Sequence, residues 1–128
     1  MAEIKKIYTK NAPDAIGPYS QATVVNGMVY TSGQIAINPA TGNVEATDIV
    51  GQTEQIFKNL AAVLEEAGSS LDKVVRTMCF LADVEKDFGD FNKTYEKFIT
   101  GKPARSCVGV KALPKNVLAE VEVIAVVD

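Results

Sequence analysis

The sequence contains no histidine among its 128 residues. Catalytic arrangements that depend on an imidazole base, such as Ser-His-Asp and Cys-His, are therefore excluded, and so are metal sites built from imidazole nitrogens. Any acid–base chemistry must come from Glu, Asp, Lys, Tyr, Cys or an ordered water molecule.

Cysteine and long apolar runs are also scarce. Cys79 and Cys107 are the only cysteines, and they are too few to indicate the disulfide framework of a small secreted protein. The longest unbroken apolar run, Val123 to Val127, is far shorter than a membrane span. The first six residues open no apolar signal-peptide core. The sequence therefore predicts a cytoplasmic protein with no membrane partner.

Basic side chains do not outnumber acidic ones. There are 13 Lys and Arg against 16 Asp and Glu, which gives a formal net charge of -3. A nucleic-acid-binding domain usually concentrates Lys and Arg on one face, whereas these lysines are scattered, so we expect no nucleic-acid partner. No linker, repeat or low-complexity tract divides the chain, and residues 1–128 are predicted to form a single domain.

Turn signals and hydrophobic periodicity predict an ordered series of elements. Asn26-Gly27 favours a two-residue hairpin turn, because both residues tolerate positive φ. A helix is predicted over 47–67, with Thr47 or Asp48 as its N-cap and Gly68 ending it. The other predicted elements are a turn over 38–43, a strand over 71–82, a helix over 85–99, and strands over 105–110 and 117–127.

The order hairpin, helix, strand, helix, two strands predicts an α+β domain. Two helices cover only one face of such a sheet, so an apolar opposite face needs another layer that this chain does not supply. The last strand carries an alternating run of small or β-branched side chains: Val117, Ala119, Val121, Val123, Ala125 and Val127. We infer that one sheet face packs against identical subunits, and both a dimer and a trimer satisfy this argument.

An arginine lies inside the apolar strand that precedes the last strand. Strand alternation puts Arg105 and Cys107 on one face. If a short loop joins the two strands as an antiparallel pair, Arg105 lies opposite Glu122 or, after a two-residue shift, opposite Glu120. In either register these four side chains share a face. Two interpretations stay open: a cross-strand ion pair, or a site in which the forked donors of Arg105 bind a planar carboxylate.

Five further residues are candidates for a binding site. Tyr19 follows a Gly-Pro turn and either projects into a cleft or packs. Ser32 and Gly33 offer a hydroxyl and a backbone amide, or form an ordinary strand end. Asn92 lies on the apolar side of the second helix, where a buried amide needs partners, so it is a structural tie or a pocket residue. Cys107 is interpreted as a small wall residue, because no histidine is present to activate its thiol.

Together these segments resemble the RidA family (YjgF/YER057c/UK114), the reactive intermediate deaminases, over nearly the whole chain. The motifs that carry the resemblance are Ala15-Ile16-Gly17-Pro18-Tyr19-Ser20-Gln21-Ala22, Tyr30-Thr31-Ser32-Gly33-Gln34-Ile35, Pro103-Ala104-Arg105-Ser106-Cys107-Val108, Leu113-Pro114-Lys115 and Glu120-Val121-Glu122. This ensemble in this order is specific, whereas an arginine alone in a strand is not. Ala119 departs from the pattern, since larger aliphatic residues are common there, and this concerns the packing behind Glu120.

The resemblance implies a chorismate-mutase-like α+β fold assembled as a homotrimer, with clefts at the subunit boundaries. It also implies a 2-iminobutanoate/2-iminopropanoate deaminase that uses no metal and no cofactor. In this reaction water adds to a 2-iminoacid, including the tautomer of 2-aminoacrylate, and releases a 2-ketoacid and ammonia. The non-catalytic alternative is a regulatory or chaperone-like trimer that binds 2-ketoacids.

The same resemblance assigns roles to residues. It implies that Arg105 holds the substrate carboxylate and that Glu120 orients or activates the attacking water. The residues implied to complete the substrate pocket are Tyr19, Ser32, Gly33, Asn92 and Cys107, the last through its backbone.

Overall fold

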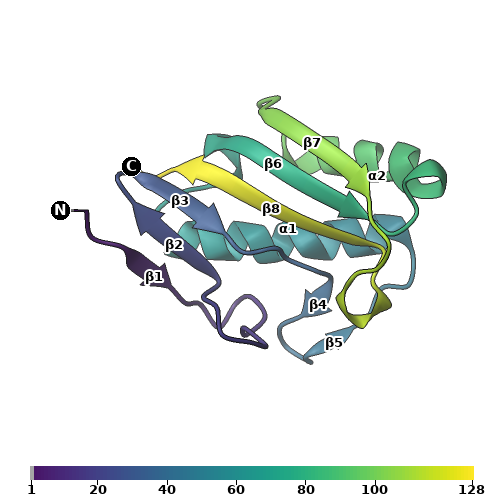
Figure 1. Cartoon of the computed structure of the whole chain (residues 1–128), viewed down its shortest axis with the longest axis horizontal. Helices are drawn as coiled ribbons and strands as arrows, with labels where there is room; N and C mark the ends of the chain where they lie inside the picture. Colours follow the sequence, from purple (N-terminus) through teal and green to yellow (C-terminus); the bar gives the residue numbers. More distant parts are fainter. Residues whose placement is uncertain (1) are drawn as a thin grey trace.

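The computed structural model describes residues 2–128, which contain two α-helices, two short 3-10 helices and eight strands in two sheets (Figure 1). In chain order the elements are β1 (Lys5–Ile7), β2 (Ala22–Val25), β3 (Met28–Thr31), β4 (Ile37–Asn38), β5 (Asn43–Val44), α1 (Ile49–Glu66), η1 (Leu71–Lys73), β6 (Val74–Leu81), α2 (Val84–Phe98), β7 (Ala104–Gly109), η2 (Pro114–Asn116) and β8 (Ala119–Val126). The predicted series of hairpin, helix, strand, helix and two strands is present. β1 and the β4–β5 pair are additions, because strands of two or three residues carry too little periodicity to be recognised.

The first hairpin forms around Asn26-Gly27, as predicted. Val25 pairs with Met28 across the turn, and the two turn residues have φ of 51° and 76°. Positive φ at both central positions gives a backbone twist that matches the twist of the flanking strands. β1 then pairs antiparallel with β2 and becomes one edge of the main sheet.

Both helices begin at an aspartate cap. The Asp48 side chain accepts a hydrogen bond from the Gly51 amide at 3.1 Å, and the Asp83 side chain accepts one from the Lys86 amide at 3.2 Å. Gly68, with φ of 84°, adopts the left-handed conformation that follows the end of α1. The predicted helices are therefore confirmed, with α2 lying one residue earlier than predicted at each end.

The order of strands in the main sheet corrects the predicted pairing of the last two strands. The order is β1-β2-β3-β8-β6-β7, so β6 lies between β7 and β8. β6 pairs parallel with β7 and antiparallel with β8. The prediction of an antiparallel β7–β8 hairpin is wrong. The strand predicted over 71–82 also begins three residues later, because its first residues form η1.

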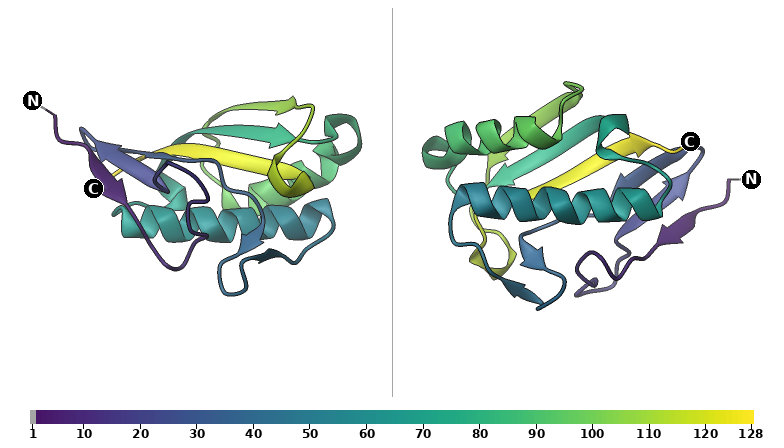
Figure 2. Two further views of the ribbon diagram at one scale, coloured as in Figure 1. Left: turned by 60° about the horizontal axis from the view of Figure 1, so that its bottom comes forward. Right: turned by 180° about the vertical axis from the view of Figure 1, so that it is seen from behind.

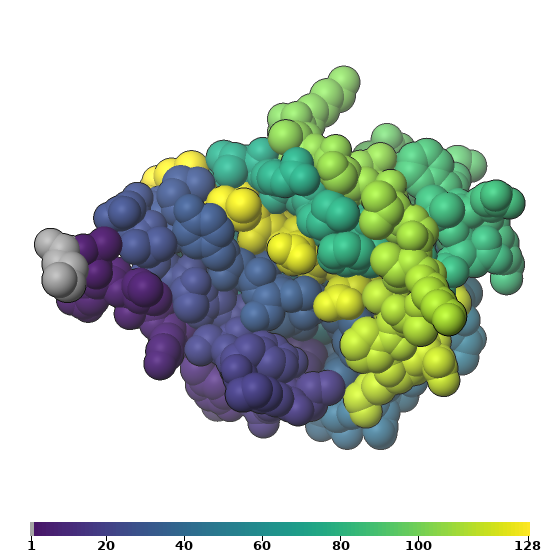
Figure 3. All heavy atoms as spheres, viewed as in Figure 1, coloured from purple at the N-terminus to yellow at the C-terminus, as the bar shows by residue number. Residues whose placement is uncertain are grey.

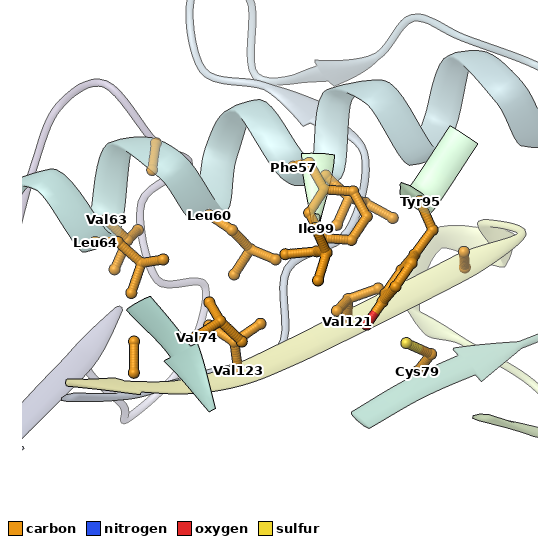
Figure 4. Packing of buried hydrophobic residues seen from close by; sticks show 14 of the residues in the cluster. Phe57, Leu60, Val63, Leu64, Val74, Cys79, Tyr95, Ile99, Val121 and Val123 are labelled. Carbon is orange, nitrogen blue, oxygen red and sulfur yellow. The ribbon is translucent and has the colours of Figure 1, made fainter. Parts of the chain in front are cut away.

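Both helices lie on one face of the main sheet, as Figure 2 shows from behind. The core fills the space between them, with Phe57 and Leu60 of α1 packed over Val121 and Val123 of β8 (Figure 4). The alternating apolar residues at odd positions from 119 to 125 are therefore covered by the helices of the same chain. They cannot be the surface for another subunit, which corrects that part of the inference.

Within residues 2–128 no helix covers the opposite sheet face, and Figure 3 shows this face with β3, β8, β6 and β7 across it. Tyr30, Val108 and Val126 remain 42%, 40% and 39% exposed there. Phe80 pairs laterally with Val108 on one side and with Glu120 on the other, which places both glutamates of β8 on this open face. Among the described residues, no helix is long and apolar enough to cross a membrane.

Candidate functional site

The predicted site residues fall into two groups, and the first surrounds Arg105 of β7. The guanidinium Nη1 donates a hydrogen bond to Oδ1 of Asn92 at 2.8 Å. Its central carbon lies 4.8 Å from the ring centroid of Tyr95 and 5.8 Å from that of Phe88. All three partners belong to α2, so Arg105 points toward the helix-covered face of the sheet.

Helical spacing explains why α2 supplies these contacts. Residues 88, 92 and 95 are separated by four and three positions and therefore share one face of the helix. Asn92 was a candidate pocket residue, and its amide oxygen now has a defined partner in Arg105. Phe88 and Tyr95 were not among the candidate residues taken from the sequence. The signal that identifies them is their spacing from Asn92 along the face that meets β7.

Arg105 has no carboxylate partner among the described residues. The one ion pair in residues 2–128 joins Lys73 to Asp128, far from this group. The half-buried guanidinium is instead held by a neutral amide oxygen and two aromatic faces. The cross-strand ion pair with a glutamate is therefore absent among these residues. The positive charge of Arg105 is not neutralised by a carboxylate, so the guanidinium can bind an external anion.

The second group lies around Glu120 of β8. An open cleft of about 370 Å³ is lined by Ile16, Tyr19, Ser32, Gly33, Pro114 and Glu120. In Figure 3 the N-terminal loop (purple) and the loop before β8 (yellow-green) flank this part of the open face. Four of the predicted site residues are thus brought together in one cleft by segments far apart in the sequence.

Gly33 leaves room for the Glu120 side chain, which crosses over it. A Cβ at position 33 would lie 2.8 Å from Cδ and 3.0 Å from Cγ of Glu120. These separations are below normal contact distance, so any side chain here would displace the carboxylate. The neighbouring Gln34 fixes the backbone, because its amide and carbonyl exchange hydrogen bonds of 2.8 and 3.1 Å with Val121.

Polar groups of the cleft have defined donor and acceptor capacity. The Ser32 hydroxyl donates to the Ser20 carbonyl at 2.7 Å, so toward a ligand it offers acceptor lone pairs. The Tyr19 hydroxyl accepts from the Ile16 amide at 3.3 Å, which leaves its own proton free to donate. Within residues 2–128 no atom accepts a hydrogen bond from the Gly33 amide.

A narrower cavity of about 60 Å³ adjoins the cleft and shares Tyr19, Gly33 and Glu120 as lining residues. This volume has room for one or two water-sized molecules. Gln21 also lines this cavity, although it was quoted only within a motif and not as a site residue. The Gln21 side chain donates to the carbonyls of Thr9 and Pro13 and accepts from the Thr9 amide at 2.7 Å, which ties the N-terminal loop to β2.

The Glu120 carboxyl has a pKa above its ordinary value. Burial is the larger cause, since it disfavours the charged form, and the negative charge of Glu122 adds to it. Arg105 of the same chain is not among the causes of this pKa shift. The carboxylate is therefore a stronger base than an exposed glutamate.

The two groups are separate in a single chain, which corrects the prediction that their side chains share a face. Arg105 and Cys107 pair laterally with Thr77 and Cys79 on the helix-covered face. Glu120 alternates with buried neighbours and so faces the open side, as does Glu122. Because β6 lies between β7 and β8, the two strands are also about 10 Å apart. A small ligand cannot contact Arg105 and Glu120 of the same chain.

Cys79 and Cys107 are direct partners across the parallel β6–β7 pair. Burial raises the pKa of the Cys79 thiol to about 12. Burial also raises the pKa of the half-buried Cys107 thiol, against a smaller lowering by the Arg105 charge. A thiol with a raised pKa is a poor nucleophile at neutral pH, which agrees with Cys107 as a wall residue. Among the described residues, no three His, Cys, Asp or Glu side chains cluster as metal ligands.

Comparison with known proteins gives consistent matches along the whole chain. The family model described as endoribonuclease L-PSP matches residues 9–127. A Lactococcus lactis protein named "Putative regulator AldR" is 54% identical over 123 residues, which cover 95% of this chain and 97% of that protein. The 2-iminobutanoate/2-iminopropanoate deaminase of Escherichia coli K12 is 48% identical over 126 residues, with coverage of 95% and 97%. The crystal structure of E. coli TdcF with bound serine matches with a TM-score of 0.90 at 40% identity, covering 97% of this chain and 99% of that one.

Proposed function

This chain belongs to the endoribonuclease L-PSP family, which includes RidA and YjgF, and we propose that it hydrolyses reactive 2-iminoacids to 2-ketoacids and ammonia. The proposed substrates are 2-iminobutanoate, 2-iminopropanoate and its tautomer 2-aminoacrylate. The deaminase name of the 48% identical relative supports this substrate class. The proposal keeps the cytoplasmic location expected from the sequence.

The observation that carries the proposal is the guanidinium of Arg105, which has only neutral partners in residues 2–128. Every 2-iminoacid bears a carboxylate, the planar anion that the forked donors of arginine fit best. A charge-assisted pair of this kind contributes roughly 1.5–3 kcal/mol. That corresponds to about ten- to a hundredfold in binding, or somewhat more.

Glu120 supplies the proposed base. Its carboxylate accepts a proton from a water molecule, and the water oxygen forms a bond to the imine carbon of the substrate. The proton is returned to the imine nitrogen, which gives a carbinolamine. Glu120 then moves the hydroxyl proton of this intermediate to the same nitrogen, the carbon–nitrogen bond breaks as the carbonyl forms, and ammonia and the 2-ketoacid are released. The small cavity beside Glu120 has a suitable size for the water, and the proposed steps use only water and protein groups. Imines already hydrolyse in water, so holding the substrate and placing one water are the main tasks.

We further propose that the complete site forms between copies of this chain in a homotrimer. Arg105, Asn92 and Cys107 of one copy would face the Tyr19, Ser32, Gly33 and Glu120 cleft of the next. The separation of the two groups in one chain supports this arrangement, because each group alone lacks either the anchor or the base. The exposed apolar side chains of the open sheet face, among them Tyr30 and Val108, support contact with another copy.

The first experiment measures imine loss directly. Iminoacids are generated in the cuvette with an amino-acid oxidase or a serine/threonine dehydratase and are trapped with semicarbazide. We expect the wild-type protein to compete with the trap and the Arg105→Ala variant to lose most of this activity. Arg105→Lys should also be strongly impaired, because a point charge does not reproduce the planar fork. No acceleration by wild type across small and large iminoacids would contradict the deaminase proposal.

A second experiment tests the shared site. Arg105→Ala and Glu120→Gln are each expected to be nearly inactive alone. If they are unfolded together and refolded as mixed oligomers, about a quarter of the sites should contain one intact Arg105 and one intact Glu120 from different copies. Recovered activity supports the shared site. A mixture that forms mixed trimers by mass spectrometry but remains inactive would contradict it.

The second candidate function is a non-catalytic ligand sensor. The name of the 54% identical L. lactis protein favours this alternative. The two functions differ in one measurement: a sensor binds a 2-ketoacid saturably at the Arg105 site but does not accelerate imine loss. The family description also mentions an endoribonuclease, yet the net charge of -3 and the lack of histidine give no support to RNA as the substrate here.

A further inference from the structure

We propose that Tyr95 is a positioning residue that fixes the plane of the Arg105 guanidinium for the substrate carboxylate. This inference rests on the proposed function, in which Arg105 anchors a 2-iminoacid. Tyr95 would not touch the reacting atoms, and it would act only through Arg105.

The first observation is a cation–π contact between Arg105 and a ring that is itself tied to the sheet. The guanidinium carbon lies 4.8 Å from the Tyr95 ring centroid. The Tyr95 hydroxyl forms a 2.8 Å hydrogen bond with the Thr77 hydroxyl. Thr77 is the lateral partner of Arg105 in the parallel β6–β7 pair. The Tyr95 ring is therefore tied to β6, the strand that pairs with the arginine-bearing β7. The paired strands hold the ring and the guanidinium in a fixed relative position.

The second observation is that the Tyr95 ring cannot rotate freely. It is only 8% exposed. Phe57 of α1 meets it edge-on at 5.5 Å with an interplanar angle of 81°, and Phe91 lies 5.8 Å away. Figure 4 shows Tyr95 reaching from α2 toward the strand of Cys79, with its oxygen nearest the sheet. Contacts from α1, α2 and β6 thus fix both the position and the tilt of the ring.

Aromatic stacking also leaves the arginine able to bind a ligand. A guanidinium has five N–H donors, and Asn92 accepts from one nitrogen. A ring face attracts the cation electrostatically without accepting those donors in the guanidinium plane. An acidic residue in the same place would consume donors and neutralise the charge. Tyr95 therefore holds the orientation of Arg105 and leaves its remaining donors for a carboxylate.

Phe88 offers an internal comparison. Its ring lies farther from the guanidinium, at 5.8 Å, and the side chain is 40% exposed. It has no hydroxyl with which to tie itself to the sheet. We therefore expect Phe88 to contribute less to the orientation of Arg105 than Tyr95 does.

The experiment compares Tyr95→Leu, which removes the ring, with Tyr95→Phe, which keeps the ring and removes the tether. Steady-state imine hydrolysis gives KM and kcat, and calorimetry with 2-oxobutanoate gives the Kd of a carboxylate-bearing product. We expect Tyr95→Leu to raise both KM and this Kd about three- to thirtyfold, with a smaller change in kcat. Tyr95→Phe should rescue most of the loss and stay within about threefold of wild type.

Thr77→Val tests the tether from its other end. Thr77→Val and Tyr95→Phe remove the same hydrogen bond, so the double variant should be no worse than either single variant. The matched control is Phe98→Leu, which removes another aromatic ring of α2. Phe98 stacks on Phe57 at 5.4 Å and does not contact Arg105. We expect Phe98→Leu to lower the melting temperature but to leave KM and the 2-oxobutanoate Kd unchanged.

Two results would overturn the inference. One is a Tyr95→Leu variant with wild-type KM and Kd. The other is an equal rise in both constants for Phe98→Leu, which would indicate a general packing effect. A wild-type protein that binds 2-oxobutanoate but does not hydrolyse imines would refute the proposed function alone, since the Kd comparison would still test the role of Tyr95.

Discussion

The two halves of the candidate site handle charge in opposite ways. Around Arg105 a cation lies among neutral partners, an amide oxygen and two ring faces, which hold it without neutralising it. Around Glu120 an anion is partly buried beside a second carboxylate, so its charged form is disfavoured. One half is ready to bind an anion and the other to accept a proton. Neither half balances its own charge within the chain, which is the pattern expected of two surfaces that complete each other.

The largest expected effects separate the anchor from the base. Glu120→Gln removes the proposed proton acceptor but keeps the shape of the side chain, and a positioned base contributes roughly 10²–10⁴-fold. Because imines are intrinsically reactive, we expect kcat to fall by about a hundredfold, at the low end of that range. Arg105→Ala should instead raise KM, by about ten- to a hundredfold. Steady-state kinetics with a dehydratase-generated iminoacid measure both constants.

This contrast depends on each variant remaining folded. Circular dichroism and sedimentation provide the control, and neither substitution should change the fold or the oligomeric state. If Glu120→Gln altered only KM while Arg105→Ala altered only kcat, the assignment of the two halves would be reversed.

The next effect in size compares a glycine beside Glu120, Gly33, with a control glycine in α2, Gly89. Gly33→Ala would push its Cβ into the Glu120 side chain, and overpacking of this kind costs about 1–3 kcal/mol. Activity should fall by about tenfold, because the added Cβ displaces the Glu120 carboxylate, the proposed base, from its position. Gly89→Ala in α2 is the matched control: an added Cβ there meets no atom within 4 Å. It should stabilise the helix by about 0.5–1 kcal/mol.

Urea unfolding measures both free energies, and the imine assay measures activity. A Gly33→Ala variant as stable and active as Gly89→Ala would show that the Glu120 side chain has room to move aside.

A smaller effect concerns the pH dependence of activity, which tests the surroundings of Glu120 without changing Arg105. Glu122 raises the pKa of Glu120, so Glu122→Gln should lower it. The acidic limb of the kcat/KM profile, where activity is lost as Glu120 is protonated, should move to lower pH. A pH–rate profile from pH 4 to 8 measures the shift. A profile unchanged by Glu122→Gln but abolished by Glu120→Gln would leave burial as the sole cause.

The free energy of unfolding should also depend on pH through the Glu120 carboxyl, and the direction of this dependence follows from the raised pKa. A carboxyl with a raised folded pKa binds more protons when folded, so its favourable contribution is full below the unfolded pKa. That contribution is lost as pH rises through the folded pKa. Glu120→Gln should therefore be more stable than wild type at pH 7, and the difference should shrink toward pH 4.

The smallest effect concerns the Cys107 thiol on the Arg105 side. Its raised pKa predicts slow alkylation by iodoacetamide at pH 7.5, and Cys79 should react more slowly still. Arg105→Ala should slow Cys107 further, because the arginine lowers that pKa. Mass spectrometry of the labelled protein over time gives the rates.

Cys107→Ala provides the matching activity test. We expect it to retain most activity, because the thiol is not assigned a chemical step. An inactive Cys107→Ala variant, or rapid labelling at neutral pH, would indicate that the Cys107 thiol acts as a nucleophile.

Local signals in the sequence were sufficient for most of the elements. Asn26-Gly27, Asp48 and Gly68 each act through their own backbone or their nearest neighbours, so a short window of sequence contains the cause. Asn92 was singled out because a buried amide needs a partner, and in the structure that partner is Arg105. Its place in a substrate pocket stays a prediction.

The neighbours of β7 could not be predicted in the same way. A short loop before β8 favours a hairpin, since consecutive strands usually pair. In the structure α2 forms a crossover that returns β7 parallel to β6, and this leaves β8 the place between β6 and β3. That choice depends on how α2 packs on α1 and the sheet. Because β7 was predicted to pair with β8 instead of β6, Arg105 and Glu120 were assigned to the same sheet face.

The contact between Gly33 and Glu120 also restricts how this chain can change over evolutionary time. A first mutation that adds a side chain at position 33 meets an occupied space, whereas shortening position 120 first leaves room for it. The two positions therefore have a preferred order of substitution, and their effects should not be additive. A lineage that lost the glutamate could later fill position 33 and would then be unable to regain the glutamate in one step. Loss of Glu120, the proposed base, is for that reason easier than its recovery in this chain.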